Sequence, residues 1–329
     1  MTIIAGIIGM GIGAKHLDAI EKYKESFVKT ICEKDNKKIK YLKKRYPNIK
    51  ITSNENEIFY DKSINLVSIA SYDNYHYRQI VKGLNNKKNL IVEKPLCLKF
   101  NELKKIDFLL KKNKRIKITS NLVLRVNSLF NYFKRNINVK DIFYIEGDYI
   151  WGRKEKLFGW RSKIKEYSLI LGAGIHIIDL VMWLTGLRPK FVSVYNNKKC
   201  TSNTKFKKDS LNLMIFEFPN NILVKISANG AAIHDHFHEL KIFTKSKTFT
   251  NTKQGAYLYK KNKIEKINVD YPDKKNRKKL IHNFLDIILK KKVKPIINHS
   301  QLIDLMSVCM SAVKASKINK KIKIKYLKR

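Results

Sequence analysis

Short apolar runs alternate with segments of helical spacing along the first third of the chain. Apolar runs of the kind found in buried parallel strands predict strands at residues 3–8, 26–32, 49–52, 65–70, 90–92 and 116–120. Apolar residues three and four positions apart predict helices at residues 14 to about 24, 36–46, 74–84 and 101–110. This β–α repetition predicts a doubly wound parallel sheet, the α/β fold class.

From about residue 122 the pattern changes to longer strands, several of which alternate apolar and polar positions. Strands are predicted at residues 143–149, 191–195, 211–218, 222–228 and 239–243. Helical spacing predicts helices at residues 175–184, 276–289 and 300–318. The succession of strands predicts an α+β domain with a largely antiparallel, open sheet. We therefore expect two domains, residues 1–121 and residues 122–329.

The composition agrees with two packed domains. The chain has 329 residues, of which 44% are hydrophobic, and no apolar run approaches the roughly 20 residues that span a bilayer. Its four cysteines are scattered and form no C-x-x-C pair, which is typical of reduced thiols. The apolar start lacks the features of a signal peptide. We expect a cytoplasmic protein that does not associate with a membrane.

The formal net charge of +42 is unusually high. A polyanionic partner such as nucleic acid is one explanation. The other is compositional, because lysine greatly outnumbers arginine and the basic residues are spread along the whole chain without an aromatic-interleaved stripe. We expect no specific nucleic-acid partner. A negatively charged substrate, such as a nucleotide sugar, is compatible with both explanations.

The first strand is followed by a glycine-rich turn, Gly9-Met10-Gly11-Ile12-Gly13-Ala14, that fits G-x-G-x-x-G/A and opens a helix. Gly9 permits the tight turn, Gly11 lets the backbone approach a pyrophosphate, and Ala14 lets helix and strand pack closely. The helix N-terminus then presents unpaired N–H groups to the phosphates. The turn predicts that residues 1–121 form a Rossmann NAD(P)-binding domain. The cofactor contacts expected here are Gly9, Gly11, Ile12, Gly13 and Ala14.

Glu33 ends the second strand, about 20 residues after the glycine turn. An acid at this place accepts hydrogen bonds from the adenosine ribose hydroxyls and would repel a 2′-phosphate. Glu33 therefore favours NAD. Because Lys34 follows it directly, NADP stays open.

More specific motifs follow, and together they resemble one family. Glu93-Lys94-Pro95 comes directly after an apolar strand. The loop Ser68–Ser71 followed by Asn74-Tyr75-His76, the segment Gly174-Ile175-His176-Ile177-Ile178-Asp179-Leu180 and the helix end Trp183–Gly186 also match. The chain resembles the glucose–fructose oxidoreductase / inositol dehydrogenase / MocA (Gfo/Idh/MocA) family from Ile3 to about Ile324.

This resemblance implies an NAD(P)-dependent oxidoreductase that interconverts an alcohol and a ketone on a sugar, nucleotide sugar or cyclitol. It implies that residues 122–329 bind the substrate and assemble a homodimer or homotetramer through the exposed sheet. Further cofactor contacts implied by the family motifs are Ser71, His76, Glu93, Lys94 and Asn121.

Oxidising a secondary alcohol requires a group that takes the hydroxyl proton as hydride leaves. The resemblance implies that Lys94 does so, with its pKa lowered by burial and by a positive nicotinamide ring. His176 would share the proton transfer or bind the substrate oxygen, and Asp179, one turn on, would orient it.

One position departs from the family. Many members carry an Asp four residues before this His, where the chain has Gly172. Two functions therefore stay open: catalysis by Lys94 and His176 without that acid, or a catalytically silent cofactor-binding sensor or regulatory protein of the same fold.

The expected substrate contacts lie after the Rossmann domain. They are Arg125, Trp160, Arg161, His176 and Asp179. Arg125 follows the last Rossmann strand. The segments Trp151-Gly152-Arg153 and Gly159-Trp160-Arg161 precede the His176 helix and would form a substrate wall, with arginines that suit an anionic group.

Three histidines, His234, His236 and His238, alternate along a short segment. On a strand they would share one face and could bind a transition metal. A polar sheet face or a subunit interface is the alternative, and since the family chemistry needs no metal, we expect no metal site.

Overall fold

The computed structural model describes residues 2–269 and 271–328, which divide into two compact units. The first unit combines the chain up to Val123 with Lys275–Ile303, and the second combines Leu124–Lys274 with the chain from Asp304 onward. The sequence places a single boundary after residue 121. The structure has two further crossings, because Lys275–Ile303 returns to the first unit and the chain then re-enters the second.

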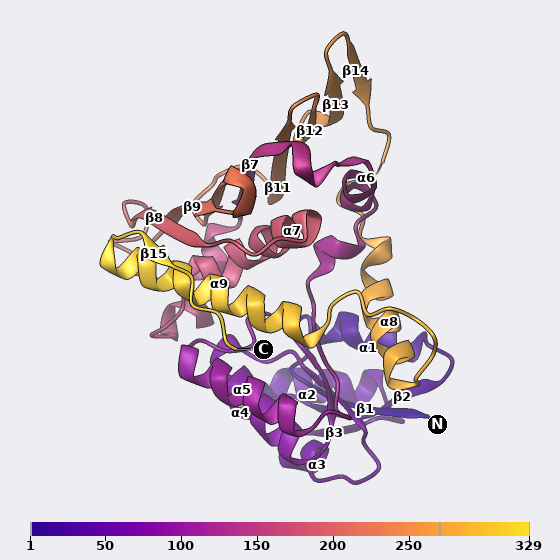
Figure 1. Cartoon of the computed structure of the whole chain (residues 1–329). Coiled ribbons are helices and arrows are strands. Elements are labelled where there is room, and N and C mark those ends of the chain that lie inside the picture. Colours follow the sequence, from indigo (N-terminus) through magenta and orange to yellow (C-terminus); the bar gives the residue numbers. More distant parts are fainter. Residues whose placement is uncertain (1, 270, 329) are drawn as a thin grey trace. The chain divides into compact units, whose positions relative to one another are not determined.

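The first unit contains a six-stranded sheet in which every pair of neighbouring strands is parallel (Figure 1). Its strands are β1 (Ile3–Ile8), β2 (Ser26–Cys32), β3 (Lys50–Thr52), β4 (Leu66–Ile69), β5 (Asn89–Val92) and β6 (Ile118–Ser120). The order β3-β2-β1-β4-β5-β6 is that of a dinucleotide-binding Rossmann sheet, in which ligands bind at the carboxyl ends of the strands where the order reverses. The predicted doubly wound parallel sheet is confirmed.

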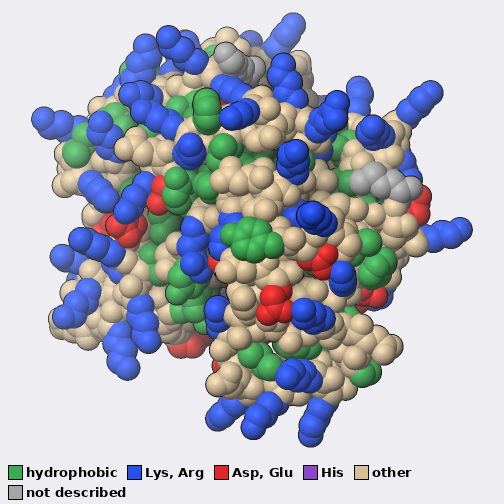
Figure 2. Space-filling model, turned by 90° about the horizontal axis from the view of Figure 1, so that it is seen from below, with side chains coloured by type: hydrophobic (Ala, Val, Ile, Leu, Met, Phe, Trp, Pro, Cys, Tyr) green, Lys and Arg blue, Asp and Glu red, His purple; other side chains and the backbone are tan. Residues whose placement is uncertain are grey.

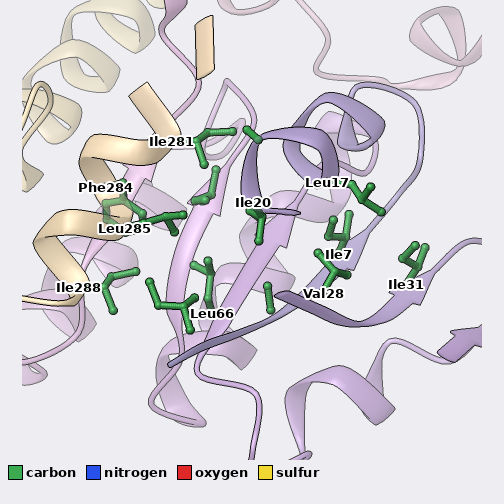
Figure 3. Close-up of a cluster of buried hydrophobic side chains, with 14 of the residues drawn as sticks. Ile7, Leu17, Ile20, Val28, Ile31, Leu66, Ile281, Phe284, Leu285 and Ile288 are labelled. Atoms are coloured by element: carbon green, nitrogen blue, oxygen red, sulfur yellow. The ribbon is translucent and has the colours of Figure 1, made fainter. Parts of the chain in front are cut away.

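Helices connect these strands, and one comes from the C-terminal part of the chain. They are α1 (Gly13–Glu21), α2 (Asn36–Arg45), α3 (Asn56–Phe59), α4 (Asp73–Asn85), α5 (Phe100–Lys112) and α8 (Lys278–Ile288). Figure 3 shows the apolar face of α8 directed into the same buried cluster as Ile20 and Leu66, through Ile281, Phe284, Leu285 and Ile288. Burying this amphipathic stripe explains why α8 belongs to the first unit.

The second unit contains a nine-stranded sheet with the order β14-β13-β12-β11-β7-β10-β9-β8-β15. Its strands are β7 (Ile142–Ile150), β8 (Phe191–Asn197), β9 (Leu211–Glu217), β10 (Leu223–Asn229), β11 (Phe237–Thr244), β12 (Lys247–Thr252), β13 (Gly255–Lys260), β14 (Lys263–Lys266) and β15 (Ile322–Lys323). Neighbours are antiparallel except for β7 and β10. The predicted largely antiparallel sheet is confirmed. Strands β12 to β15 were not predicted, because lysine, threonine and other polar residues interrupt their apolar positions and give a weak pattern.

The second unit also has α6 (Ser128–Asn136), α7 (Ile175–Thr185) and the part of α9 (His299–Ile318) from Asp304 onward. Helix α7 is mostly apolar and buried, as expected of a core helix, and it ends at Gly186 in the left-handed conformation. A five-residue π-helical turn, Ile170–Gly174, leads directly into it. None of the helices over residues 2–269 and 271–328 has the length and apolarity needed to cross a membrane.

Candidate functional site

The glycine turn after β1 has the geometry of a phosphate-binding loop. Gly9 has φ +88°, and a Cβ there would lie 2.6 Å from the Ala70 carbonyl oxygen, so only glycine fits. A Cβ on Gly11 would meet nothing within 4 Å, and Gly11 and Ile12 are exposed. The outer side of the turn is therefore open to a ligand at the N-terminus of α1.

Glu33, which directly follows β2, hydrogen-bonds to the backbone of this turn. Its Oε2 accepts the Met10 backbone N–H at 3.0 Å, and its Oε1 accepts those of Lys34 and Asp35 at 2.8 and 3.2 Å. Two carboxylate oxygens offer about four acceptor sites, so three such bonds leave capacity for a ribose hydroxyl. The sequence predicts that Glu33 contacts the cofactor, but it does not predict these hydrogen bonds to the backbone.

A buried network holds the Glu93-Lys94-Pro95 turn that follows β5. Glu93 Oε1 lies 3.1 Å from His16 Nε2 and accepts the Asn121 side-chain N–H at 2.6 Å. The other ring nitrogen of His16 lies 2.7 Å from the Ser68 hydroxyl oxygen. His16 therefore ties the helix after the glycine turn to β4 and to Glu93. Sequence reasoning missed it, although a histidine on the apolar face of α1 was a signal.

The network keeps the Glu93 carboxylate charged. Burial alone would raise the pKa of Glu93, but hydrogen bonding and electrostatic attraction from His16, together with the Lys94 ammonium, lower it below its usual value. Glu93 thus presents a fixed negative charge beside the backbone of Lys94.

We expect Glu93→Gln to destabilise the first unit by about 1–3 kcal/mol at pH 7, because the amide cannot replace a charged acceptor of two hydrogen bonds. A carboxyl with a lowered folded-state pKa contributes stability above its unfolded pKa, near 4.5, and loses it as the pH falls through the folded value. The difference between variant and parent, measured by calorimetry, should therefore shrink below about pH 4.5. Glu57→Gln, at a partly exposed residue that pairs with the exposed Lys50, is the control with little change. An equal effect of both substitutions would contradict the prediction.

His76 and Ser71 lie in the loop after β4. His76 is fully buried, and its ring nitrogens lie 2.7 Å from the Pro95 carbonyl oxygen and 3.1 Å from that of Ser71. The Ser71 hydroxyl donates to Gln79 at 2.6 Å. His76 therefore joins this loop to the turn that carries Lys94, which is half-buried at the carboxyl end of β5.

In the second unit, His176 lies at the start of α7 within a group of aromatic rings. Its imidazole stacks on Tyr149 of β7, with 5.7 Å between ring centroids and an interplanar angle of 10°. His238 packs edge-on to both, at 6.2 Å from His176 and 4.9 Å from Tyr149. The Tyr271 hydroxyl lies 2.5 Å from His238 Nδ1. We call Tyr149, His176, His236, His238 and Tyr271 the imidazole cluster.

The histidine segment differs from the predicted strand. His234 and His236 precede β11, which begins at Phe237, so the three imidazoles do not line one strand face. His236 instead packs against His238, at 4.7 Å, and its Nδ1 lies 2.9 Å from the Ile150 carbonyl oxygen. Within residues 2–269 and 271–328, no group of three His, Cys, Asp or Glu side chains is arranged to hold a metal ion.

Arg125 and Asp179 pair with each other. Arg125 Nη2 donates to Asp179 Oδ1 at 2.6 Å and its Nε donates to Oδ2 at 3.0 Å, with only 4% and 1% of the two residues exposed. Burial raises the pKa of Asp179 above its usual value, against the opposing effect of the guanidinium. The sequence predicts separate roles for these residues. Their bidentate pair shows that they also fix α7 to the segment before α6.

Trp160 and Arg161 form a stack. The Arg161 guanidinium carbon lies 4.2 Å from the ring centroid of Trp160 and 5.2 Å from that of Trp151. A guanidinium held over the face of an indole ring is pre-organised to bind an anion. The predicted grouping of the two tryptophan-containing segments is therefore observed within the second unit, and whether it contacts a substrate stays a prediction.

The family descriptions cover most of the chain. "Oxidoreductase family, NAD-binding Rossmann fold" matches residues 3–121, and "Oxidoreductase family, C-terminal alpha/beta domain" matches residues 134–322.

Among individual relatives, inositol 2-dehydrogenase of Salmonella typhimurium is 25% identical over 246 residues, which are 71% of this chain and 70% of that protein. The uncharacterized oxidoreductase YhhX of Escherichia coli is 25% identical over 198 residues, 59% of this chain and 56% of that protein. The chain thus matches only about half the length of the latter.

Two solved structures share the fold over nearly their whole length. Myo-inositol 2-dehydrogenase of Lactobacillus plantarum superposes with a TM-score of 0.85 at 17% identity, covering 99% of this chain and 100% of that one. Scyllo-inositol dehydrogenase of Lactobacillus casei, solved with NAD(H) and scyllo-inositol, gives a TM-score of 0.82 at 17% identity, covering 98% and 99%. At 17% identity, the similarity to these two structures establishes the fold alone.

Proposed function

The chain belongs to the Gfo/Idh/MocA oxidoreductase family, and on that premise we propose that it is an NAD-dependent dehydrogenase of a sugar, nucleotide sugar or cyclitol. The observation that carries the proposal is the buried network around Glu93, which fixes the backbone of Lys94 in an NAD-binding Rossmann unit.

The residues of the first unit fit a dinucleotide. The open side of Gly11 and the N-terminus of α1 would hold the pyrophosphate, and Glu33 would accept the ribose hydroxyls. Glu33 is only 9% exposed, and a second negative charge beside it would be costly. This supports NAD over NADP. When bound, the nicotinamide accepts the hydride.

The chain's own part of the chemistry is proton transfer and positioning. In the proposal, the Lys94 amine takes the proton of the substrate hydroxyl. His176 hydrogen-bonds the substrate oxygen, with its ring plane held by the stacked Tyr149 ring. Lysine suits this role because its amine can lose a proton, whereas a guanidinium cannot.

The substrate class follows from the polar rings and from the relatives. Imidazole and phenol groups such as those of His238 and Tyr271 bind hydroxyl-rich molecules by hydrogen bonds. The similar proteins named inositol dehydrogenases act on cyclitols, and a UDP-N-acetylglucosamine 3-dehydrogenase of Acidithiobacillus ferrooxidans shares the fold. The stacked Arg161 supports a nucleotide sugar as the second substrate class to assay.

Gly172 favours one alternative function, a cofactor-binding sensor or regulatory protein without turnover. With glycine at this position, the chain has no acidic side chain one turn before His176. A protein of this kind would bind NAD with no dependence of any catalytic rate on Lys94.

For assembly, we propose a homo-oligomer that pairs through the open face of the large sheet. Tyr144 and Phe243 stack on this face at 5.6 Å, and Leu223 is registered beside Tyr144 and half exposed. Free thiols at all four cysteines support the cytoplasm as its location. On the face shown in Figure 2, lysine and arginine side chains are spread among other residues and form no single stripe, which supports a compositional origin of the charge.

The cofactor assignment is tested by a matched pair of glycine variants. Gly11→Ala adds a methyl group where the chain leaves space, so we expect unchanged unfolding and NAD affinity reduced about 100-fold, because the methyl blocks the pyrophosphate. Gly9→Ala places a Cβ 2.6 Å from a carbonyl oxygen at φ +88°, so we expect lower stability as well. Binding is measured by calorimetry and unfolding by circular dichroism. NAD affinity unchanged in Gly11→Ala would refute the site.

Catalysis is assayed by NADH absorbance at 340 nm with inositols, sugars and nucleotide sugars as substrates. Turnover with one class, absent in Gly11→Ala, supports the proposed dehydrogenase. Tight NAD binding without turnover of any class would favour the sensor.

A further inference from the structure

A cavity of about 240 Å³ in the second unit is bordered by lysines on every side. Its wall comes from residues 165–169, from the loop between β8 and β9, and from the last part of α9. Each of these three segments contributes lysine side chains, which are Lys165, Lys198, Lys207, Lys208 and Lys317. Two acids, Glu166 and Asp209, are also in the wall. The lysines outnumber them, so the cavity has a positive charge.

The two carboxylates are each close to one lysine. Glu166 and Lys208 attract each other, as do Asp209 and Lys198. The side chains of Lys165, Lys207 and Lys317 form no ion pair among the residues that the structure describes. Ammonium groups gathered around one cavity repel each other, and an anion between them removes that repulsion. The charge of the wall therefore favours an anionic ligand.

Lys208 is partly buried, and its side chain is held in place. Its Nζ donates to the Ser162 carbonyl oxygen at 3.3 Å and lies 5.3 Å from the ring centroid of Phe206. Burial lowers the pKa of Lys208, against the opposing attraction of Glu166. An ammonium group that has lost part of its hydration attracts an anion more strongly than one in open solvent. Lys208 is thus prepared to bind a negative charge.

The loop that contributes three of these lysines is held by its own hydrogen bonds. The hydroxyl of the fully buried Thr201 donates to the Lys208 carbonyl oxygen, and the Thr201 N–H donates to that of Lys198 at 2.9 Å. The Ser210 N–H closes the loop by donating to the Asn197 carbonyl oxygen at 2.8 Å. A ligand therefore meets a wall whose backbone is already ordered, which lowers the entropic cost of binding.

Within this loop, Lys207 has a backbone conformation that residues other than glycine rarely adopt, with φ +23°. Strain of this kind persists only where the surrounding structure imposes it, and it occurs most often at functional sites. A glycine at position 207 would relieve the strain but would bring no charge to the cavity. The lysine found there supports a role for its ammonium group.

The other two segments of the wall are joined to the same loop and sheet. Tyr167, in residues 165–169, packs edge-on to Phe206 of the loop, with 5.6 Å between ring centroids. The Asn196 side chain of β8 donates to the carbonyl and hydroxyl oxygens of Ser316 in α9, at 3.0 and 2.9 Å. Figure 1 shows this end of α9 beside β8. The cavity is thus enclosed by connected parts of the second unit.

The size and the charge of the cavity define its ligand. A volume of about 240 Å³ is below the roughly 300–1,000 Å³ of pockets for drug-sized molecules, so the bound group is compact. Lysine binds phosphate as a point charge, and ammonium groups on several sides suit an anion with more than one phosphate group. We propose that this cavity, which we call the lysine cavity, binds the diphosphate group of a small phosphorylated molecule. The inference goes beyond the proposed dehydrogenase and does not depend on it.

The first experiment uses inorganic pyrophosphate, titrated into the full chain by calorimetry at about 0.15 M salt. We expect one molecule to bind per chain. The variant Lys207→Gln with Lys317→Gln should bind about 10- to 100-fold more weakly, because it removes an ammonium group from each of two sides of the cavity. The variant Lys205→Gln with Lys314→Gln is the matched control. It removes the same charge from the same loop and helix, at exposed lysines outside the wall, and should bind like the parent protein.

Two results of this titration would overturn the lysine cavity. One is a parent protein that binds no pyrophosphate. The other is an equal affinity of the two double variants, which would show that the net charge of +42 attracts the anion without a defined site. All four substituted lysines are exposed, so we expect both variants to fold, as circular dichroism checks.

The second experiment locates the bound anion by hydrogen exchange. Pyrophosphate should slow amide exchange in residues 165–169 and 198–210 of the parent protein and not in Lys207→Gln with Lys317→Gln. The glycine turn after β1 is the other candidate for binding a pyrophosphate, so Gly11→Ala serves as a second control and should keep the full affinity. Slowed exchange at that turn alone would place the anion at the cofactor site and overturn the inference.

Two sources share this ligand chemistry, a free phosphorylated molecule and the diphosphate of a nucleotide sugar. UDP-glucose that displaces pyrophosphate, and that binds Lys207→Gln with Lys317→Gln more weakly, would identify the nucleotide sugar. Pyrophosphate binding that UDP-glucose does not affect would identify a free phosphorylated molecule. Both results support the lysine cavity. None of these measurements needs turnover, so a parent protein without dehydrogenase activity contradicts the proposed function and leaves this inference standing.

Discussion

Replacement of Lys94 by methionine is expected to lower kcat for alcohol oxidation by about 10²–10⁴-fold, while the affinity for NAD changes by less than about threefold. Methionine keeps the length and the apolar stem of the side chain but has no amine, so only the proton acceptor is lost. The backbone of residue 94 stays fixed, because Glu93 keeps its bonds to His16 and Asn121. Loss of rate with retained binding is the signature of an interaction made only in the transition state.

Three further variants make the assignment specific. Lys94→Arg retains the charge but should remain inactive, because a guanidinium does not release a proton at neutral pH. In Lys94→Ala, small primary amines added to the assay should restore part of the rate. Lys117→Met, at an exposed lysine of the same unit, should match the parent protein. A Lys94→Met variant with parental kcat would mean that another group accepts the proton.

The parts of the fold that were predictable are those in which neighbours in sequence determine the structure. Strands β1 and β2 have the predicted bounds, because both are short, rich in apolar and β-branched residues, and separated by the glycine turn and a helical pattern. The glycine turn could also be predicted from the sequence, since the backbone at Gly9, with φ +88°, requires glycine. The return of α8 to the first unit could not be predicted, because an amphipathic helix can pack its apolar face against any apolar core.

The contacts among the predicted site residues could not be predicted from the sequence. Arg125 and Asp179 are 54 residues apart, and His16 and Glu93 are 77 apart. Such pairs depend on how whole elements pack, which no local spacing encodes. Gly172 is the sharpest case. The sequence shows only that an acid is missing there, whereas the structure shows the Tyr167 phenol in its space.

The Arg125–Asp179 pair leads to the largest expected effect on stability. We expect Arg125→Met to destabilise the second unit by about 3–5 kcal/mol at pH 8, because it leaves a buried carboxylate without its cation. Lys321→Met is the control: Lys321 pairs with Glu217 at 2.5 Å, but 51% and 38% of the two side chains are exposed, so its loss should change stability by about 1 kcal/mol or less. Urea unfolding followed by tryptophan fluorescence reports this unit, since Trp151, Trp160 and Trp183 all lie in it.

The pH dependence of this effect has a definite sign. Burial already raises the pKa of Asp179 in the parent protein, and removal of the guanidinium raises it further. A carboxyl with a raised folded-state pKa stabilises the fold below its unfolded pKa, near 3.8, and loses that contribution as the pH rises through the folded value. In Arg125→Met, Asp179 can take up a proton at low pH and escape the cost of a buried charge. The destabilisation should therefore be clearly smaller at pH 5 than at pH 8, by up to about 1.4 kcal/mol per pH unit between the two folded-state pKa values. Equal destabilisation at both pH values would show that Asp179 stays charged and gains other partners, and that the guanidinium is not what holds its charge.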